Sequence, residues 1–165
     1  MGQQTPPQLK RPWAGNSQEA ITIKEVVREK VDVDRPSSAA WKHLARLEDW
    51  PSWADHIRRM EPTPPGDLTA STQVLLHMSA GPRNNMIVTE YDPPNRWVWE
   101  GRSFGVTTLF EHKFEEIDQN RTRIWFLASM SGPLALLVGP IFGRMMHRYL
   151  SRALPKLKSQ MEAAD

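Results

Sequence analysis

The alternation of apolar and polar residues changes period twice in the first third of the chain. Residues 21–34, ITIKEVVREKVDVD, are rich in β-branched side chains and mostly alternate, which predicts a long strand that ends before Pro36. From residue 36 to residue 47 the apolar residues recur at helical spacing, and the proline suits a first helical turn. The segment WPSW at 50–53 breaks this helix and predicts the start of a second short one.

Six segments of strand character follow, separated by residues that are typical of turns. The breaks are rich in Pro, Gly, Asn and Asp, as in PTPPG at 62–66 and DPPN at 92–95. Such short connections favour hairpins, so we expect an antiparallel meander. The predicted strands are 57–61, 70–79, 84–91, 96–103, 105–117 and 121–131.

Residues 133–163 are predicted to form one long amphipathic helix. Apolar residues recur every three or four positions from Leu134 to Met161, and Pro140 and Pro155 are expected to kink or interrupt the helix. The apolar face is needed to cover the sheet, so we interpret the other face as solvated, with weak contact to an anionic membrane as the alternative. That face carries Arg144, Arg148, Arg152, Lys156 and Lys158.

The order of these elements predicts an α+β fold. It consists of a strand, two short helices, six further strands and a long C-terminal helix. Seven antiparallel strands form a sheet whose apolar face must be covered, and the last helix is the only large element left to cover it. A curved sheet wrapped around one helix does not close completely, so we expect a cavity between them.

Composition narrows the class of protein further. A chain of 165 residues fits one domain, and residues 1–18, rich in Gln, Pro and Gly, are expected to be a disordered tail that precedes a single domain at 19–165. Seven tryptophans predict a large core or a lined pocket. The net charge of +2 and the absence of a recognised binding motif argue against a nucleic-acid partner.

The residue types that hold metals are scarce. The chain has no cysteine, no pair of histidines at the i, i+4 spacing of a helical metal site, and no cluster of carboxylates beside a histidine. We therefore expect neither a metal nor a cofactor. The N-terminal segment lacks the apolar region of a secretory signal, and the apolar run 133–143 is shorter than the about 20 residues that cross a bilayer, so we expect a cytoplasmic protein.

Several segments carry a family resemblance through their order and spacing. They are VDRP at 33–36, LEDWPSW at 47–53, VTEYDPPNRWVWEG at 88–101, NRTR at 120–123 and SGP at 131–133. Together they resemble the START/Bet v 1-like (SRPBCC) superfamily, in its polyketide cyclase/dehydrase and lipid-transport group, over residues 20–162. The resemblance implies a helix-grip fold with a hydrophobic pocket for an apolar or aromatic small molecule. It does not select the ligand, because such folds serve several functions.

Strand alternation selects the side chains expected to line the pocket. Trp97 and Trp99 share one face of their strand, and Phe110, His112 and Phe114 share one face of the next. The full set of candidate ligand-binding residues is Trp97, Trp99, Phe110, His112, Phe114, Phe126, Met130, Leu137, Ile141 and Met145.

His112 is the candidate for polar chemistry. Burial between two phenylalanines without a partner costs about 1–3 kcal/mol, so this histidine requires a hydrogen-bond partner or a ligand contact. It is either a polar anchor or general base of the pocket, or a structural histidine with satisfied hydrogen bonds.

Other polar residues have no settled direction in the sequence. Only one of Glu90 and Tyr91 can face the pocket, and the face of His77 is ambiguous. His43 and His56 flank the helix pair and are expected to be surface or helix-cap residues.

Three functions remain open at the level of sequence. The first is binding of a hydrophobic small molecule that is lipid-like, aromatic or polyketide-like. The second is a cofactor-independent enzyme of the aromatase/cyclase or dehydratase kind, with His112 as the acid or base. The third is a protein-interaction module that uses the outer sheet face around Trp125 and Leu127. The ligand and the oligomeric state stay undetermined.

Overall fold

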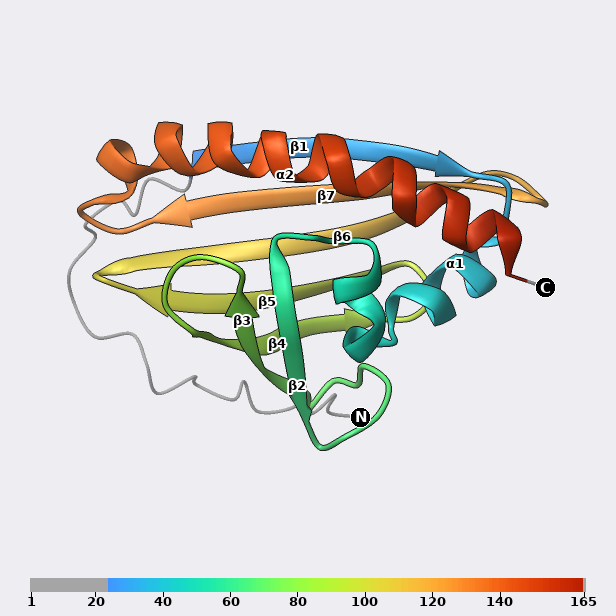
Figure 1. Ribbon diagram of the computed structural model, residues 1–165, viewed down its shortest axis with the longest axis horizontal. Coiled ribbons are helices and arrows are strands. Elements are labelled where there is room, and N and C mark those ends of the chain that lie inside the picture. Colours follow the sequence, from blue (N-terminus) through green and yellow to red (C-terminus); the bar gives the residue numbers. More distant parts are fainter. Residues whose placement is uncertain (1–23, 165) are drawn as a thin grey trace, which may run out of the picture.

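The alternating N-terminal segment forms the first strand of a curved sheet that wraps around one long helix (Figure 1). The computed structural model describes residues 24–164, so the predicted tail, the domain boundary at residue 19 and the first residues of the predicted strand lie outside the described residues. The elements are β1 (Lys24–Val33), α1 (Ser37–Leu44), the short 3-10 helix η1 (Leu47–Ser52), β2 (Ile57–Thr63), β3 (Gln73–Met78), β4 (Asn84–Asp92), β5 (Arg96–Ser103), β6 (Val106–Asp118), β7 (Arg121–Ser131) and α2 (Ala135–Ala163).

The seven strands form one antiparallel sheet in the order β1-β7-β6-β5-β4-β3-β2. Strands β2 to β7 follow one another as hairpins, which confirms the predicted meander. Strand β1 closes the other edge by pairing with β7, the last strand in the chain. The observed α+β architecture is therefore the predicted helix-grip fold.

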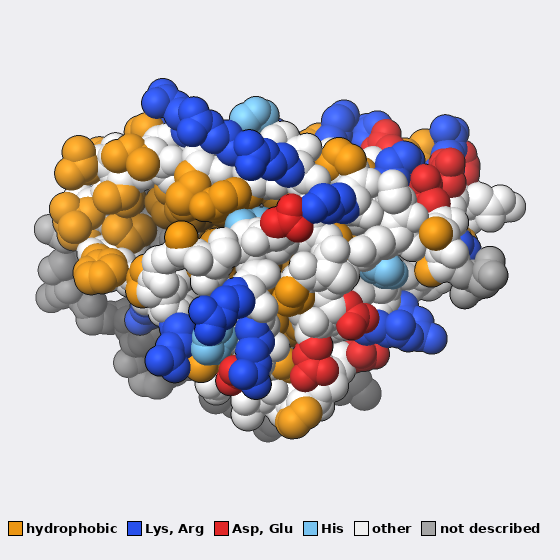
Figure 2. Space-filling view, in the orientation of Figure 1, with side chains coloured by type: hydrophobic (Ala, Val, Ile, Leu, Met, Phe, Trp, Pro, Cys, Tyr) orange, Lys and Arg blue, Asp and Glu red, His pale blue; other side chains and the backbone are white. Residues whose placement is uncertain are grey.

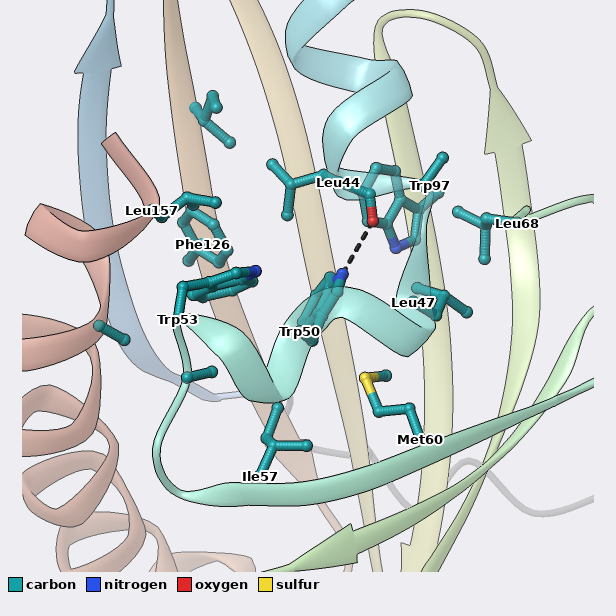
Figure 3. Close-up of a cluster of buried hydrophobic side chains, with 14 of the residues drawn as sticks. Leu44, Leu47, Trp50, Trp53, Ile57, Met60, Leu68, Trp97, Phe126 and Leu157 are labelled. Atoms are coloured by element: carbon teal, nitrogen blue, oxygen red, sulfur yellow. Dashed lines mark hydrogen bonds between the residues drawn. The ribbon is translucent and has the colours of Figure 1, made fainter. Parts of the chain in front are cut away.

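Helix α1 ends earlier than the sequence predicts. Its last residue is Leu44, and the chain then turns into η1 at Leu47. The indole Nε1 of Trp50 donates a hydrogen bond to the Leu44 carbonyl oxygen over 2.8 Å (Figure 3), so it supplies the partner that this carbonyl lacks at a helix end. The buried face of α1 contains Ala40, Trp41 and Leu44, as the helical spacing predicts.

Helix α2 is continuous from Ala135 to Ala163, so the predicted interruption at Pro140 or Pro155 is wrong. Each proline removes one backbone N–H, and both are exposed, so water can satisfy the carbonyl oxygen that loses its partner. Among residues 24–164, no helix combines the length and the apolar character that crossing a membrane requires.

The middle of α2 approaches β1 at backbone distance. A Cβ atom placed on Gly143 would lie within 3.0 Å of the Val26 carbonyl oxygen, and one on Gly139 would lie 3.1 Å from a Val26 methyl group. Val26 sits in a β-bulge, where the pairing of β1 with β7 shifts register between Glu25 and Val27. Glycine at 143 is therefore required by space rather than by helix propensity.

Replacing Gly143 with alanine should destabilise the protein. In an open helix position, glycine to alanine adds about 1 kcal/mol of stability, but here the new methyl group meets a backbone oxygen and forces α2 away from β1. We expect Gly143→Ala to lower the free energy of unfolding in urea by about 1–3 kcal/mol. Gly139→Ala, which meets a movable methyl group, serves as the control and should cost less. A gain in stability for Gly143→Ala would contradict this packing.

Candidate functional site

A cavity of about 480 Å³ lies between the concave face of the sheet and α2. Its wall is almost entirely apolar and draws on the strands β1 to β7, η1 and α2. The polar side chains that reach it are His56, Asn84, Arg102, Ser103, Thr108 and His112. This volume falls in the about 300–1,000 Å³ range of pockets that hold drug-sized ligands.

Six of the ten predicted site residues line the cavity. The four that do not are Trp97, Phe114, Leu137 and Ile141. The six are Trp99, Phe110, His112, Phe126, Met130 and Met145.

Trp97 and Phe114 do face inward, but α1 covers them. Their rings lie 4.9 Å and 5.4 Å from the ring of Trp41, and both side chains are buried. Helix α1 therefore fills this end of the concave face, and the cavity begins one pleat further along β5, at Trp99.

Leu137 and Ile141 point to the outside of α2, where each is 71% exposed. The helix instead turns Val138, Phe142 and Met146 toward the cavity, at positions i, i+4 and i+8. The predicted apolar face of the helix is thus rotated by about one residue at its N-terminal end.

Several lining residues escaped the sequence prediction. Trp50 of η1 and Trp53, the residue after η1, reach the cavity from the segment that the sequence treated as a helix break. Six of the eight methionines of the chain also line it: Met60, Met78, Met86, Met130, Met145 and Met146. A stripe of apolar residues at 138, 142, 146 and 150 was the signal for the helix face.

His112 lies within a set of aromatic rings and is 4% exposed. Its imidazole stacks on Trp97 at 4.6 Å and has the rings of Trp50, Trp99 and Phe126 at 5.4, 5.3 and 5.1 Å. Burial lowers the pKa of His112 to about 3, so the ring is neutral at physiological pH. Nδ1 of this ring and Nε1 of Trp97 are fully buried with no hydrogen-bond partner among residues 24–164.

The prediction that His56 is a surface or helix-cap residue is wrong. It is 7% exposed, lines the cavity and stacks on Tyr149 of α2 with ring centres 4.6 Å apart and planes 4° from parallel. Burial lowers the pKa of His56 to about 4, against a smaller opposing effect of Asp55.

The strands also determine the side-chain directions that the sequence left ambiguous, those of Glu90, Tyr91 and His77. A register shift between Val88 and Glu90 places Tyr91 on the inner side, where its hydroxyl donates to the Leu68 carbonyl at 3.1 Å. Glu90 is exposed and pairs with Arg96. His77 does not line the cavity, and its Nε2 lies 3.2 Å from a carboxylate oxygen of Glu61.

The outer face of the sheet is covered by its own charged side chains. The indole of Trp125 donates to Glu115 at 2.8 Å, and Arg28 and Lys30 lie 5.6 and 5.3 Å from its ring centre. The apolar patch that the interaction-module hypothesis requires at Trp125 is therefore partly screened by cations. Within residues 24–164, no three His, Asp or Glu side chains come together as metal ligands.

The cavity opens at one end of the molecule. The lining residues that are also exposed come from the β3–β4 turn, the β5–β6 turn and the start of α2. They include Pro82, Phe104, Leu134 and Met145. At the opposite end, α1 and η1 close the sheet with the tryptophan cluster of Figure 3.

This arrangement matches a known family. Residues 24–162 match the sequence profile of the family described as polyketide cyclase / dehydrase and lipid transport. The chain belongs to this family. The profile covers every described strand and nearly all of α2, so the cavity lies within the matched region. No curated protein matches the sequence significantly.

Solved structures show the same fold at low sequence identity. A hypothetical protein from Helicobacter pylori has a TM-score of 0.70 at 17% identity, over 97% of this chain and 99% of that one. The ZhuI aromatase/cyclase from Streptomyces sp. R1128 has a TM-score of 0.62 at 16% identity, over 85% and 94%. Norcoclaurine synthase from Thalictrum flavum has a TM-score of 0.67 at 12% identity, over 88% and 100%.

The neutral, buried His112 should make stability depend on pH in a specific direction. The unfolded chain binds a proton at this histidine below about pH 6.5, whereas the folded protein does so only near pH 3. The contribution of His112 to the free energy of unfolding is therefore complete above pH 6.5, and it is lost as the pH falls toward the pKa of His112 in the folded protein. Between about pH 6 and about pH 4 this loss reaches up to about 1.4 kcal/mol per pH unit.

We expect His112→Phe to weaken this pH dependence. The variant keeps a ring between the neighbouring aromatics and removes the buried Nδ1, so its free energy of unfolding in urea should fall less steeply with acidification. His77→Phe, the same change at a position that does not line the cavity, is the control. Parallel curves for His112→Phe and the unmodified protein would contradict a neutral His112.

Proposed function

We propose that this protein binds a hydrophobic small molecule in the cavity between the sheet and α2, with His112 as the polar anchor. The observation that carries the proposal is a cavity of about 480 Å³ with an almost wholly apolar wall and a fully buried imidazole on that wall. Burial of ligand surface at about 25 cal/mol per Å² would supply most of the affinity, before ordering costs. Family membership supports a hydrophobic ligand of this kind.

The imidazole of His112 suits a ligand with one polar group. A neutral imidazole presents one N–H donor and one acceptor nitrogen, so it can pair with a hydroxyl or carbonyl oxygen. A hydrogen bond between such a ligand and this imidazole would add about 0.5–1.5 kcal/mol to the affinity from apolar burial.

The rest of the wall favours a ligand with flat or flexible apolar parts. Trp50, Trp99, Phe110 and Phe126 offer aromatic faces and edges, and six methionines surround them. Methionine is unbranched and adapts its shape, so such a wall accepts related ligands rather than one rigid outline.

A second candidate is a cofactor-independent cyclase or dehydratase that uses His112 as general base. The observation that favours it is a histidine on the cavity wall, and two structural neighbours are named as an aromatase/cyclase and as norcoclaurine synthase. Against it, a general base works best with a pKa near the working pH, and burial lowers the pKa of His112 to about 3. The described side chains place no carboxylate against this ring to raise that pKa. Binding is therefore the better supported function.

Substitution of Trp99 should weaken binding of a hydrophobic probe. The fluorescent probe 1-anilinonaphthalene-8-sulfonate should bind one site saturably, and Trp99→Leu should raise its Kd about tenfold because a large aromatic contact is lost. Trp125→Leu, the same change on the outer face of the sheet, is the matched control and should leave Kd unchanged. Both variants must retain cooperative unfolding. Equal Kd values for Trp99→Leu and the unmodified protein would place the probe elsewhere and reject this cavity.

Analysis of the compound that copurifies with the protein also distinguishes a binding protein from an enzyme. Native mass spectrometry followed by organic extraction should release a hydrophobic compound at near-unit stoichiometry. Incubation of that compound with emptied protein should return it unchanged if the protein only binds it. Loss of water or formation of a ring, abolished in His112→Ala while the compound still binds, would favour the enzyme.

A further inference from the structure

An exposed apolar patch surrounds the opening of the cavity. Six of the eight large hydrophobic side chains that are exposed among the described residues lie at this end of the molecule, and we call them the apolar rim. Figure 2 shows hydrophobic side chains gathered there, at the left of the view. The apolar rim consists of Phe104, Leu134, Leu136, Leu137, Ile141 and Met145.

The apolar rim is one surface although it comes from two segments. The β5–β6 turn touches the link between β7 and α2, since a Cβ atom on Gly132 would lie within 3.0 Å of the Gly105 carbonyl oxygen. Phe104 and Leu134, one from each segment, also line the cavity. The apolar surface therefore continues from the outside into the pocket.

Phe104 occupies an unfavourable backbone conformation to reach this surface. Phe104 and Gly105 form the two-residue turn between β5 and β6, with φ values of 51° and 74°. Positive φ at both residues is the geometry that favours Asn-Gly, and a bulky residue in the first position is strained. The side chain is 82% exposed, so packing within the protein does not compensate for the strain. Such departures from local preference concentrate at functional sites.

Positive charge borders the apolar rim along α2. Arg144 and Arg148 follow Leu137 and Ile141 on the helix, are exposed, and form no ion pair among residues 24–164. Glu162 is the only acidic residue of α2 and is the next-to-last residue of the helix. Figure 2 shows the resulting line of Lys and Arg beside the hydrophobic side chains.

We propose that the apolar rim docks into the surface of a membrane that contains anionic lipids. The rim side chains enter the boundary between headgroups and acyl chains, and Arg144 and Arg148 contact lipid phosphates, as in interfacial helices with an apolar and a basic face. The opening of the cavity then faces the acyl chains. Charge selects this partner over a second copy of the chain, because two rims packed together would bring the same arginines of both copies close to each other. The proposal rests on the proposed function in one respect: it takes the ligand of the cavity to be a molecule that the membrane holds.

Vesicle flotation with the full chain tests this docking. The protein should bind vesicles of phosphatidylcholine and phosphatidylglycerol, bind phosphatidylcholine vesicles at least tenfold more weakly, and dissociate as salt is added. The double substitution Leu137→Ser, Ile141→Ser should weaken binding at least tenfold by removing inserted apolar surface. Neither residue lines the cavity, so the Kd of the anilinonaphthalene probe should not change.

Further variants test separately the contribution of the basic residues of α2 and that of the strained turn at Phe104. Arg144→Gln with Arg148→Gln should weaken binding about thirtyfold, because each basic residue near an anionic surface contributes about fivefold to the affinity. Lys42→Gln with Arg46→Gln removes the same charge from exposed positions around α1, at the other end of the molecule, and should have little effect. Phe104→Asn should weaken vesicle binding without lowering the unfolding midpoint, because asparagine suits this turn.

Two results would overturn the proposal. One is equal binding of the unmodified protein and Leu137→Ser, Ile141→Ser to anionic vesicles. The other is a dimer, measured by analytical ultracentrifugation, that this double substitution dissociates while vesicles are not bound. Vesicle binding without saturable probe binding would retain the docking surface and reject the proposed function. Saturable probe binding without vesicle binding would retain the proposed function and reject the docking surface.

Discussion

One helix has to cover a sheet of seven strands, and the rest of the structure depends on this mismatch. A helix with its side chains is about 10 Å wide, whereas neighbouring strands are about 4.8 Å apart, so α2 covers about two strands. It lies against β1, where Gly143 allows contact with the backbone at Val26. The remaining strands need another cover. Helices α1 and η1 provide it at one end of the sheet, and the uncovered remainder is the cavity.

The two ends of α2 consequently differ. Among the described residues, the side-chain hydrogen bonds that join α2 to the rest of the protein all involve His147 or later positions. Near the C-terminal end, the backbone N–H of Asp34 donates to Glu162 at 2.9 Å and Arg35 donates to the Met161 carbonyl at 2.8 Å. The N-terminal turns instead carry the exposed apolar side chains. The fold therefore has a closed aromatic end and an open end bordered by apolar and basic residues.

Strand pattern was enough to predict the sheet, because period-2 alternation and turn residues are local signals. The lining of the site was less predictable because it depends on tertiary contacts. Trp97 faces inward as predicted, but only the position of α1 decides that it is core rather than cavity wall. At the start of α2, residues 134–138 are all apolar, so periodicity alone could not identify which of Leu137 and Val138 faces the cavity. The bulge before Glu90, which sets the direction of Tyr91, leaves no clear sequence signal.

Two residues on the cavity depart from local structural preferences, in addition to Trp97 in the core, whose buried Nε1 also lacks a partner among residues 24–164. Phe104 at the opening has a strained backbone, and His112 inside has a buried ring nitrogen without a partner. Each feature reduces the stability of the empty protein, and neither is needed to form the sheet, since an asparagine or a phenylalanine would suit the two places better. A molecule that pairs with His112 would stabilise the folded state by mass action, because it binds the folded chain and not the unfolded one. A ligand in the cavity would therefore stabilise the fold, as core side chains do, in addition to its part in the function.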